Sequence, residues 1–267
     1  MSDTMHHSID YLLQVGEELV IRIAHGNLSF AKRNKKDGQA AYERYELNGS
    51  ISMAANLRKA FQTSDFLKDA GEQVLVLVDS NVLLVPESEF QAEQIDTLYE
   101  HTFSDADSDV RMFDELPELS AVAVYAIGKE LKAAIEERFG DVRYMAISTP
   151  VWKYFHHLHY TGHQKKLFGY FHDKKLEVFA FSQKRFKFCN SYTVSHVNDA
   201  LYFLLFVWEQ LALDQENDEL YVVGDVPGEE WLTGQLRRYV QRVSVVPSGS
   251  GQMPYDLSLL CREIQKH

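Results

Sequence analysis

Two short turns carry residue types that could bind a phosphate group. The first consists of His25, Gly26 and Asn27 and follows the apolar run LVIRIA (19–24). The second has the sequence HDKK (172–175). Glycine allows backbone N–H groups to approach a phosphate, and an aspartate at a strand end can hold Mg²⁺ through water. These turns are therefore the first candidates for a site that would bind a phosphate group together with Mg²⁺.

Neither turn has the full set of residues that this chemistry requires. The first has one glycine and no acid, and the second has Asp173 but no glycine. Cradling a phosphate with the backbone is sterically awkward without glycine. Asp173 and Lys174 are also what an ordinary soluble hairpin turn uses. The composition of the turns therefore favours plain hairpins over a working ATP site.

A third candidate is the segment VVGDVPGE (222–229), in which Gly224 and Gly228 follow an apolar run. Glycines at these positions would let a ligand approach the backbone, although any strand-to-helix connection uses such glycines. We place the candidate cofactor-binding residues in a cleft between two lobes. They are His25, Gly26, Asn27, His172, Asp173, Lys174, Gly224 and Asp225.

The segment FHHLHYTGH contains four histidines, His156, His157, His159 and His163, at spacings of three and four that suit metal ligands on a helix. No carboxylate lies among them, and Gly162 would end the helix before His163. An exposed helix end explains the pattern more simply, so no metal site is predicted, and metal binding by this cluster stays open.

Other catalytic patterns are missing from the sequence. There is no G-x-S-x-G nucleophile elbow, and PSGSGQMP (247–254) has the composition of a flexible loop. Asp79, Asp173 and Asp225 stand at strand ends but are too scattered for the clustered carboxylates of a two-metal nuclease. We therefore name no catalytic residue.

Composition describes a globular protein that can bury a large core: 267 residues, 45% hydrophobic and 25% charged. A net charge of −12 without clusters of Lys and Arg argues against binding to nucleic acid or an anionic membrane. The two cysteines exclude a thiolate metal site and fit a reducing compartment. No export signal or span-length apolar run is recognisable, so we expect a cytoplasmic protein.

The first half of the chain reads as a hairpin, a third strand (AYERYEL) and a helix capped by Ser50 or Ser52. The apolar runs EQVLVLV and AVAVYAI (121–127) predict buried strands, and Ser88 would begin a helix that reaches about Tyr99. Residues 104–119 are acidic and predict a solvated connector around one short strand. A further strand, DVRYMAIS, precedes a helix that starts at Thr149-Pro150.

The second half repeats this order from residue 165. Three strands precede a helix capped by Ser195, and two strands then alternate with helices. The helix at 195–213 is apolar almost all round, which predicts burial between lobes or against a second copy of the chain. Three antiparallel strands, a crossover helix and then parallel strands make a ribonuclease H-like unit, and two such units in tandem make the actin-like ATPase architecture.

The second half also resembles a known family. The order FCNSYTV, DALYFLLFVWEQLALDQENDELYVVGDV, LRRYV and PYDLSLLC is similar to an uncharacterised bacterial family assigned to the actin-like ATPase fold. The resemblance is most specific over 165–261 and weaker over 15–100. It implies the fold, and the family has no agreed activity to carry over.

We therefore predict an α/β protein of the actin-like ATPase fold with two ribonuclease H-like lobes, residues 1–162 and 163–267. The predicted role is that of a non-catalytic interaction or scaffold module, a candidate pseudoenzyme that binds a protein partner or forms a homodimer. We predict no cofactor, because the two turns lack the full set of residues that phosphate binding requires. The alternative is a nucleotide-binding ATPase or sugar-kinase-like enzyme with a divergent phosphate site for ATP and Mg²⁺.

Overall fold

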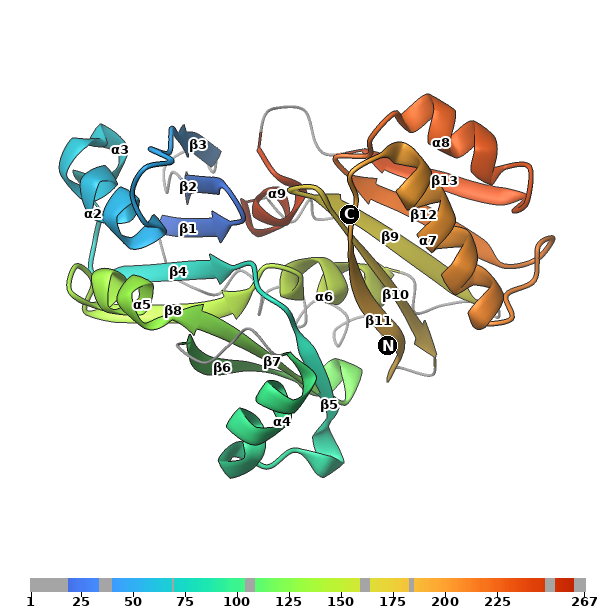
Figure 1. Ribbon diagram of the computed structural model, residues 1–267, viewed down its shortest axis with the longest axis horizontal. Helices are drawn as coiled ribbons and strands as arrows, with labels where there is room; N and C mark the ends of the chain where they lie inside the picture. The colour runs from blue at the N-terminus through green and yellow to red at the C-terminus, as the bar shows by residue number, and fades with distance from the viewer. Residues whose placement is uncertain are drawn as a thin grey trace, which may run out of the picture. The chain divides into compact units, whose positions relative to one another are not determined.

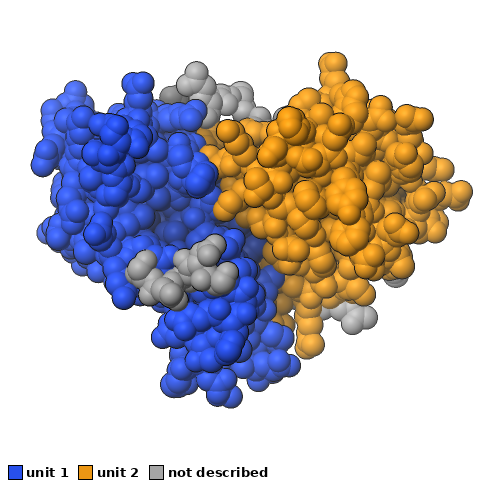
Figure 2. All heavy atoms as spheres, viewed as in Figure 1, with its two compact units in different colours: residues 1–115, 122–154, 256–267 blue, residues 116–121, 155–255 orange. Residues whose placement is uncertain are grey.

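The chain forms two compact units, coloured separately in Figure 2. The structure is a computed structural model that describes residues 19–33, 40–68, 70–103, 109–158, 164–182, 185–247 and 253–261. The first unit comprises residues 1–115, 122–154 and 256–267, and the second comprises 116–121 and 155–255. The predicted division into lobes at residue 162 stays a prediction. No helix in the described ranges has the length and apolar character of a membrane span.

A five-stranded sheet with the order β3-β2-β1-β4-β8 forms the centre of the first unit. β1 pairs antiparallel with β2 and parallel with β4, and β4 pairs parallel with β8. This is the hairpin, third strand and parallel continuation expected of a ribonuclease H-like unit. The strands are β1 Leu19–Ala24, β2 Asn27–Arg33, β3 Ala40–Tyr45, β4 Gln73–Val78 and β8 Asp141–Ala146.

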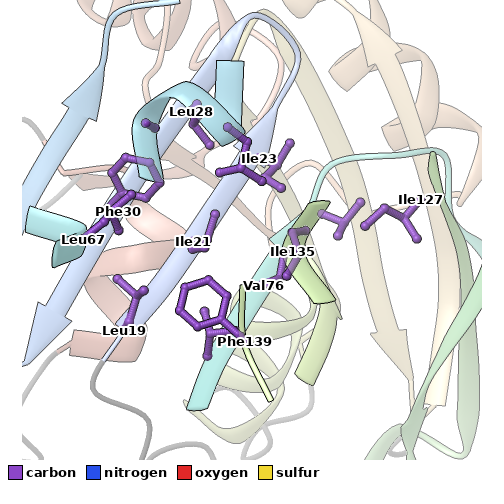
Figure 3. Close-up of a cluster of buried hydrophobic side chains, with 14 of the residues drawn as sticks. Leu19, Ile21, Ile23, Leu28, Phe30, Leu67, Val76, Ile127, Ile135 and Phe139 are labelled. Atoms are coloured by element: carbon purple, nitrogen blue, oxygen red, sulfur yellow. The ribbon is translucent and has the colours of Figure 1, made fainter. Parts of the chain in front are cut away.

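One face of this sheet packs against the helices of the same unit. Alternate residues of β1, Leu19, Ile21 and Ile23, point into a cluster that also contains side chains of α2 and α5 (Figure 3). Their alternation is the period-two pattern of a strand, and Arg22 on the opposite face is also buried. Ser52 caps α2, accepting a hydrogen bond from the Ala55 N–H at 3.2 Å, so one of the two proposed caps is confirmed. The helices are α2 Met53–Thr63, α3 Asp65–Lys68 and α5 Lys129–Glu136.

A separate three-stranded sheet, β5-β7-β6, interrupts the first unit between β4 and α5. The apolar run predicted at 121–127 lies in this sheet, so it is a buried strand as expected but not part of the five-stranded sheet. Within the predicted connector 104–119, residues from 109 onward form a long strand and a short 3-10 helix. The elements are β5 Leu83–Pro86, β6 Asp109–Leu116, η3 Pro117–Leu119 and β7 Ala121–Gly128.

The helix predicted from Ser88 is wrong over its first half. Two 3-10 turns, η1 Glu87–Glu89 and η2 Ala92–Gln94, precede α4 Ile95–Thr102. Phe90 is extended between the two turns, and its ring packs against Phe113 at 5.0 Å. This tertiary contact overrides the helical composition of the segment.

Asp114 on β6 ties the three-stranded sheet to the end of β8 and the start of α6 (Thr149–Leu158). Its Oδ2 accepts hydrogen bonds from the Ala146 N–H at 2.9 Å and the Thr149 hydroxyl at 2.7 Å. Its Oδ1 accepts one from the Tyr125 hydroxyl at 3.0 Å. Burial raises the pKa of Asp114 to about 6, against the pull of these donors. A single carboxyl group thus joins four elements of the unit.

The second unit repeats the sheet of the first, with the order β11-β10-β9-β12-β13. β9 pairs antiparallel with β10 and parallel with β12, as β1 does with β2 and β4. The topological duplication predicted from the sequence is confirmed (Figure 1). The strands are β9 Lys166–His172, β10 Lys175–Ser182, β11 Arg185–Thr193, β12 Glu219–Gly224 and β13 Arg242–Pro247.

Two helices, α7 (Val197–Gln210) and α8 (Glu229–Leu236), cover one face of this second sheet. The cap of α7 is His196 and not Ser195, because the Asp199 carboxylate accepts the N–H groups of both residues, at 2.8 and 3.0 Å. The helix is not buried all round. Tyr202 is 62% exposed and Phe206 is 42% exposed, one turn apart on the outer side.

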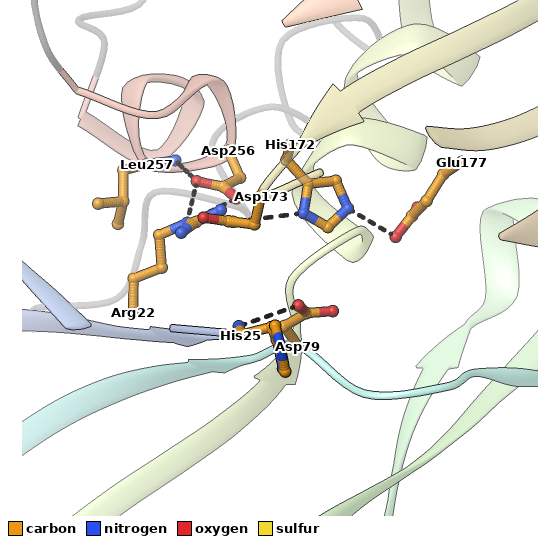
Figure 4. A network of polar contacts seen from close by, with 8 residues as sticks. All are labelled: Arg22, His25, Asp79, His172, Asp173, Glu177, Asp256 and Leu257. Atoms are coloured by element: carbon orange, nitrogen blue, oxygen red, sulfur yellow. Dashed lines mark hydrogen bonds and ion pairs between the residues drawn. The ribbon is translucent and has the colours of Figure 1, made fainter. Parts of the chain in front are cut away.

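The last helix, α9 (Tyr255–Cys261), carries a buried ion pair to the first strand. The Arg22 Nε lies 3.0 and 2.9 Å from the two carboxylate oxygens of Asp256, and both side chains are 1% or less exposed (Figure 4). The Leu257 N–H also donates to this carboxylate. Residues 234 positions apart are thus held together inside the first unit.

We expect Asp256→Ala to lower the free energy of unfolding by about 3–5 kcal/mol, because it leaves the Arg22 guanidinium buried without its carboxylate. The double variant Arg22→Met with Asp256→Leu should lose much less, because it removes both charges and fills the space. Urea denaturation of the three proteins measures the difference. A loss in the double variant as large as that in Asp256→Ala would contradict this account of the pair.

The raised pKa of Asp114 predicts a pH dependence of stability. The folded state keeps the proton to a higher pH than the unfolded chain does, so this contribution to the free energy of unfolding falls as the pH rises from 3.8 through about 6. Asp114→Asn removes the titration and should remove that part of the slope; its amide oxygen can still accept from the Ala146 N–H and the Thr149 hydroxyl, while its NH2 group must donate to the Tyr125 hydroxyl. Denaturation from pH 5 to neutrality checks this, with Glu115→Gln, a change at the exposed neighbouring acid, as control. An unchanged slope in Asp114→Asn would contradict it.

Candidate functional site

The two predicted turns lie at equivalent places in the two units. In the first, Ile23 pairs with Val78, and the next amide, that of Asp79, donates to the Ile23 carbonyl at 2.9 Å. In the second, Phe171 pairs with Gly224, and the Asp225 N–H donates to the Phe171 carbonyl at 3.0 Å. Each unit therefore places a hairpin turn and an aspartate side by side, at the end of its sheet where the parallel strands finish.

In the first turn, Ala24 pairs with Asn27, so His25 and Gly26 form a two-residue connection. Gly26 has φ +68°, a left-handed conformation that glycine adopts without cost. The His25 N–H donates to Oδ2 of Asp79 at 3.3 Å (Figure 4). A backbone donor that would face a phosphate in a binding loop is therefore directed to a carboxylate of the chain itself.

In the second turn, His172 pairs with Lys175, so Asp173 and Lys174 form the connection. Both have positive φ, 43° and 63°, as in the turn type that suits the twist of a hairpin and normally uses Asn and Gly. Two successive non-glycine residues in this region store backbone strain. The turn is therefore a tight hairpin that the surrounding strands hold in place.

The side chain of His172 lies between two acids of its own unit. Its Nε2 is 3.1 Å from Oε1 of Glu177, and its Nδ1 is 3.5 Å from Oδ2 of Asp173 (Figure 4). The ring stacks on Tyr170 at 4.7 Å and is 3% exposed. His172 and Asp173, which the sequence offers as candidates to bind phosphate and Mg²⁺, thus belong to a local polar cluster with Glu177.

Gly224 is required by packing. It has φ +86°, and a Cβ at this position would lie 2.3 Å from the Phe171 carbonyl oxygen and 3.0 Å from the Tyr170 ring. Gly228 has φ +51° and caps the N-terminus of α8. The fold alone explains why both positions are glycine, so their presence is no evidence of adenosine binding.

The structure brings the predicted residues together in two groups. His25, Gly26 and Asn27 surround the turn of the first unit, and the other five, His172, Asp173, Lys174, Gly224 and Asp225, lie at the corresponding edge of the second. Their union in one cofactor site stays a prediction. The sequence-based set omitted Asp79 and Glu177, which contact His25 and His172. The sequence places Asp79 at a strand end, but no local pattern indicates that it contacts the first turn.

The histidine cluster is only partly described. His156 and His157 lie on α6, which begins at Thr149-Pro150 as predicted, whereas His159 and His163 fall outside the described residues. The His156 ring meets the edge of Phe181 at 5.4 Å. Over the described ranges, no group of three or more His, Cys, Asp or Glu side chains is arranged to hold a metal ion.

The duplicated five-stranded units define an actin-like ATPase fold. A solved structure from Bacteroides thetaiotaomicron, described as a protein with actin-like ATPase fold and unknown function, is 25% identical, with a TM-score of 0.83 over 93% of this chain and 97% of that chain. The structure of a PilM–PilN type IV pilus biogenesis complex is 12% identical, with a TM-score of 0.56 over 86% of this chain and 88% of that chain.

Residues 11–243 match the family described as protein of unknown function (DUF3822), and the chain belongs to this family. No curated protein matches the sequence. The predicted fold and the predicted resemblance to an uncharacterised family are both confirmed.

If the second turn is a strained hairpin, Lys174→Gly should raise the free energy of unfolding by about 1 kcal/mol, because glycine adopts the left-handed conformation without steric cost. Lys175→Gly, one residue later in β10, is the matched control and should lower it. Urea denaturation measures both. A loss of stability in Lys174→Gly would show that its side chain contributes more than its backbone costs.

Proposed function

We propose that this protein is a non-catalytic interaction module, a scaffold of actin-like fold that holds a protein partner and does not hydrolyse ATP. The observation that carries the proposal is the hydrogen bond from the His25 N–H to the Asp79 carboxylate at 3.3 Å. In this position the chain supplies its own anion to the turn where a nucleotide phosphate would be expected.

The electrostatics of the first turn support the proposal. A phosphate that approached the His25 amide would have to displace a carboxylate of the same charge, and the turn offers one glycine to make room. Asp79 is fixed through its own backbone bond to the Ile23 carbonyl, so it lies beside the turn whenever β1 and β4 are paired.

The second turn supports the proposed non-catalytic role in a different way. Asp173, the candidate for Mg²⁺, lies beside the His172 ring, whose other nitrogen faces Glu177. Both central residues of the turn have side chains, so their backbone is less accessible to a triphosphate than a glycine loop would be. The alternative, a nucleotide-binding enzyme with a divergent site, depends on Asp173 and Lys174 acting in spite of this arrangement.

The remaining parts of the proposal concern partner and compartment. We infer a protein partner, with a second copy of the chain as one form it could take, because α7 exposes Tyr202 and Phe206. The structure of similar fold noted above is itself that of a protein complex. We place the protein in the cytoplasm, since Cys189 and Cys261 are free thiols.

Thermal unfolding with and without Mg-ATP tests the proposal. A ligand present at 100 times its dissociation constant adds about 2.7 kcal/mol of stability. We expect no stabilisation at millimolar Mg-ATP and no release of inorganic phosphate.

The contrary result is Mg²⁺-dependent hydrolysis that Asp173→Ala abolishes. Asp65→Ala, a change at an exposed acid on α3, is the matched control and should have no effect on any activity. This outcome would establish the enzyme alternative.

A further inference from the structure

β11 is an edge strand with an unusual composition. It has nine residues, RFKFCNSYT, and among the strands that the structure describes it pairs with β10 alone. Arg185, Lys187, Asn190, Ser191 and Thr193 are all exposed. The short helix η3 also approaches this strand, yet these five residues remain accessible.

The hydrogen-bond pattern identifies which backbone groups of β11 face outward. The Val194 N–H donates to the Lys174 carbonyl at 2.9 Å, and Tyr192 pairs with Leu176. Because antiparallel residues alternate between bonding inward and outward, the odd-numbered residues from 189 to 193 direct their N–H and C=O groups away from β10. The Ser191 N–H confirms this, since its acceptor is the side chain of Asn190 at 2.9 Å.

The charge of this edge is opposite to that of the whole protein. β11 carries Arg185 and Lys187 and no acid, whereas the chain has a net charge of −12. A strand with this charge attracts acidic segments at close range.

An aromatic surface lies next to the edge. Tyr192 of β11 stacks on Phe203 of α7 at 4.2 Å, and Phe203 meets the ring of Tyr202 at 5.3 Å. Tyr202 in turn stacks on Phe206 at 5.9 Å, and both are exposed on the outer side of α7. A strand added beside β11 could therefore direct alternate apolar side chains toward these rings.

We propose that β11 is the docking strand for an extended, acidic segment of a partner protein, which adds to the sheet as a sixth strand. The backbone of Cys189, Ser191 and Thr193 supplies the hydrogen bonds, Arg185 and Lys187 select acidic residues, and the aromatic surface selects apolar residues at alternate positions. This inference rests on the proposed function and names the class of partner.

Selection from a library of random twelve-residue peptides on the purified, full-length protein tests the proposal. We expect enrichment of peptides without proline that alternate acidic and apolar residues. Ser191→Pro should weaken their binding at least tenfold, because it removes an outward N–H and blocks the edge while leaving the pairing with β10 intact.

A second variant keeps the test valid if Ser191→Pro does not fold. Arg185→Glu with Lys187→Glu should also weaken binding at least tenfold. Lys59→Glu with Arg138→Glu is the control, since it changes the net charge equally at exposed positions of the first unit.

Each other outcome contradicts the proposal that β11 is a docking strand and points to a different role for this edge. Peptides that bind equally well to all variants would place the partner surface elsewhere and leave the interaction role standing. No enrichment would show that the charges only protect the edge from aggregation. An oligothymidylate that binds wild type and Ser191→Pro alike, but not the charge variant, would assign the edge to nucleic acid. A dimer that Ser191→Pro dissociates would assign it to a second copy.

Discussion

The parallel pairing of one strand in each hairpin with the next strand of its sheet determines the chemistry available at both turns. β1 aligns with β4, and β9 aligns with β12, in the same register. As a consequence Asp79 and Asp225 follow their strands at the same step, each bonded through its amide to the neighbouring strand. A change in this register would move the acids away from the turns, so the local electrostatics depend on the helices that pack against each sheet and stabilise its register.

The same register is the basis of the proposal that this actin-like fold acts without a nucleotide. In the first unit the carboxylate of Asp79 accepts a hydrogen bond from the His25 N–H of the turn. In the second, the acids at 173 and 177 flank a buried imidazole, and Gly224 fits against the backbone of β9 with no space for a Cβ. These contacts lie within single units, and the proposed interaction role assigns function to the outer strand and helix surfaces instead.

Much of the fold could be predicted from the sequence, because the alternating runs at 19–33 and 165–193, the cap at Ser52 and the helix start at Thr149-Pro150 are local signals. The separate sheet β5-β7-β6 could not, since AVAVYAI reads as a buried strand in either sheet. The candidate turns were found from composition. The partner of His25 was not, because Asp79 reaches it only through pairing between strands about fifty residues apart, which no local pattern records.

The most direct test of the central claim is a crystal structure of the protein grown with a nonhydrolysable ATP analogue and Mg²⁺. The account predicts that the Asp79 carboxylate stays within hydrogen-bonding distance of the His25 amide and that no phosphate density appears on either turn. Density for a triphosphate in contact with residues 25–27 or 172–175 would contradict the account and show that the protein binds a nucleotide.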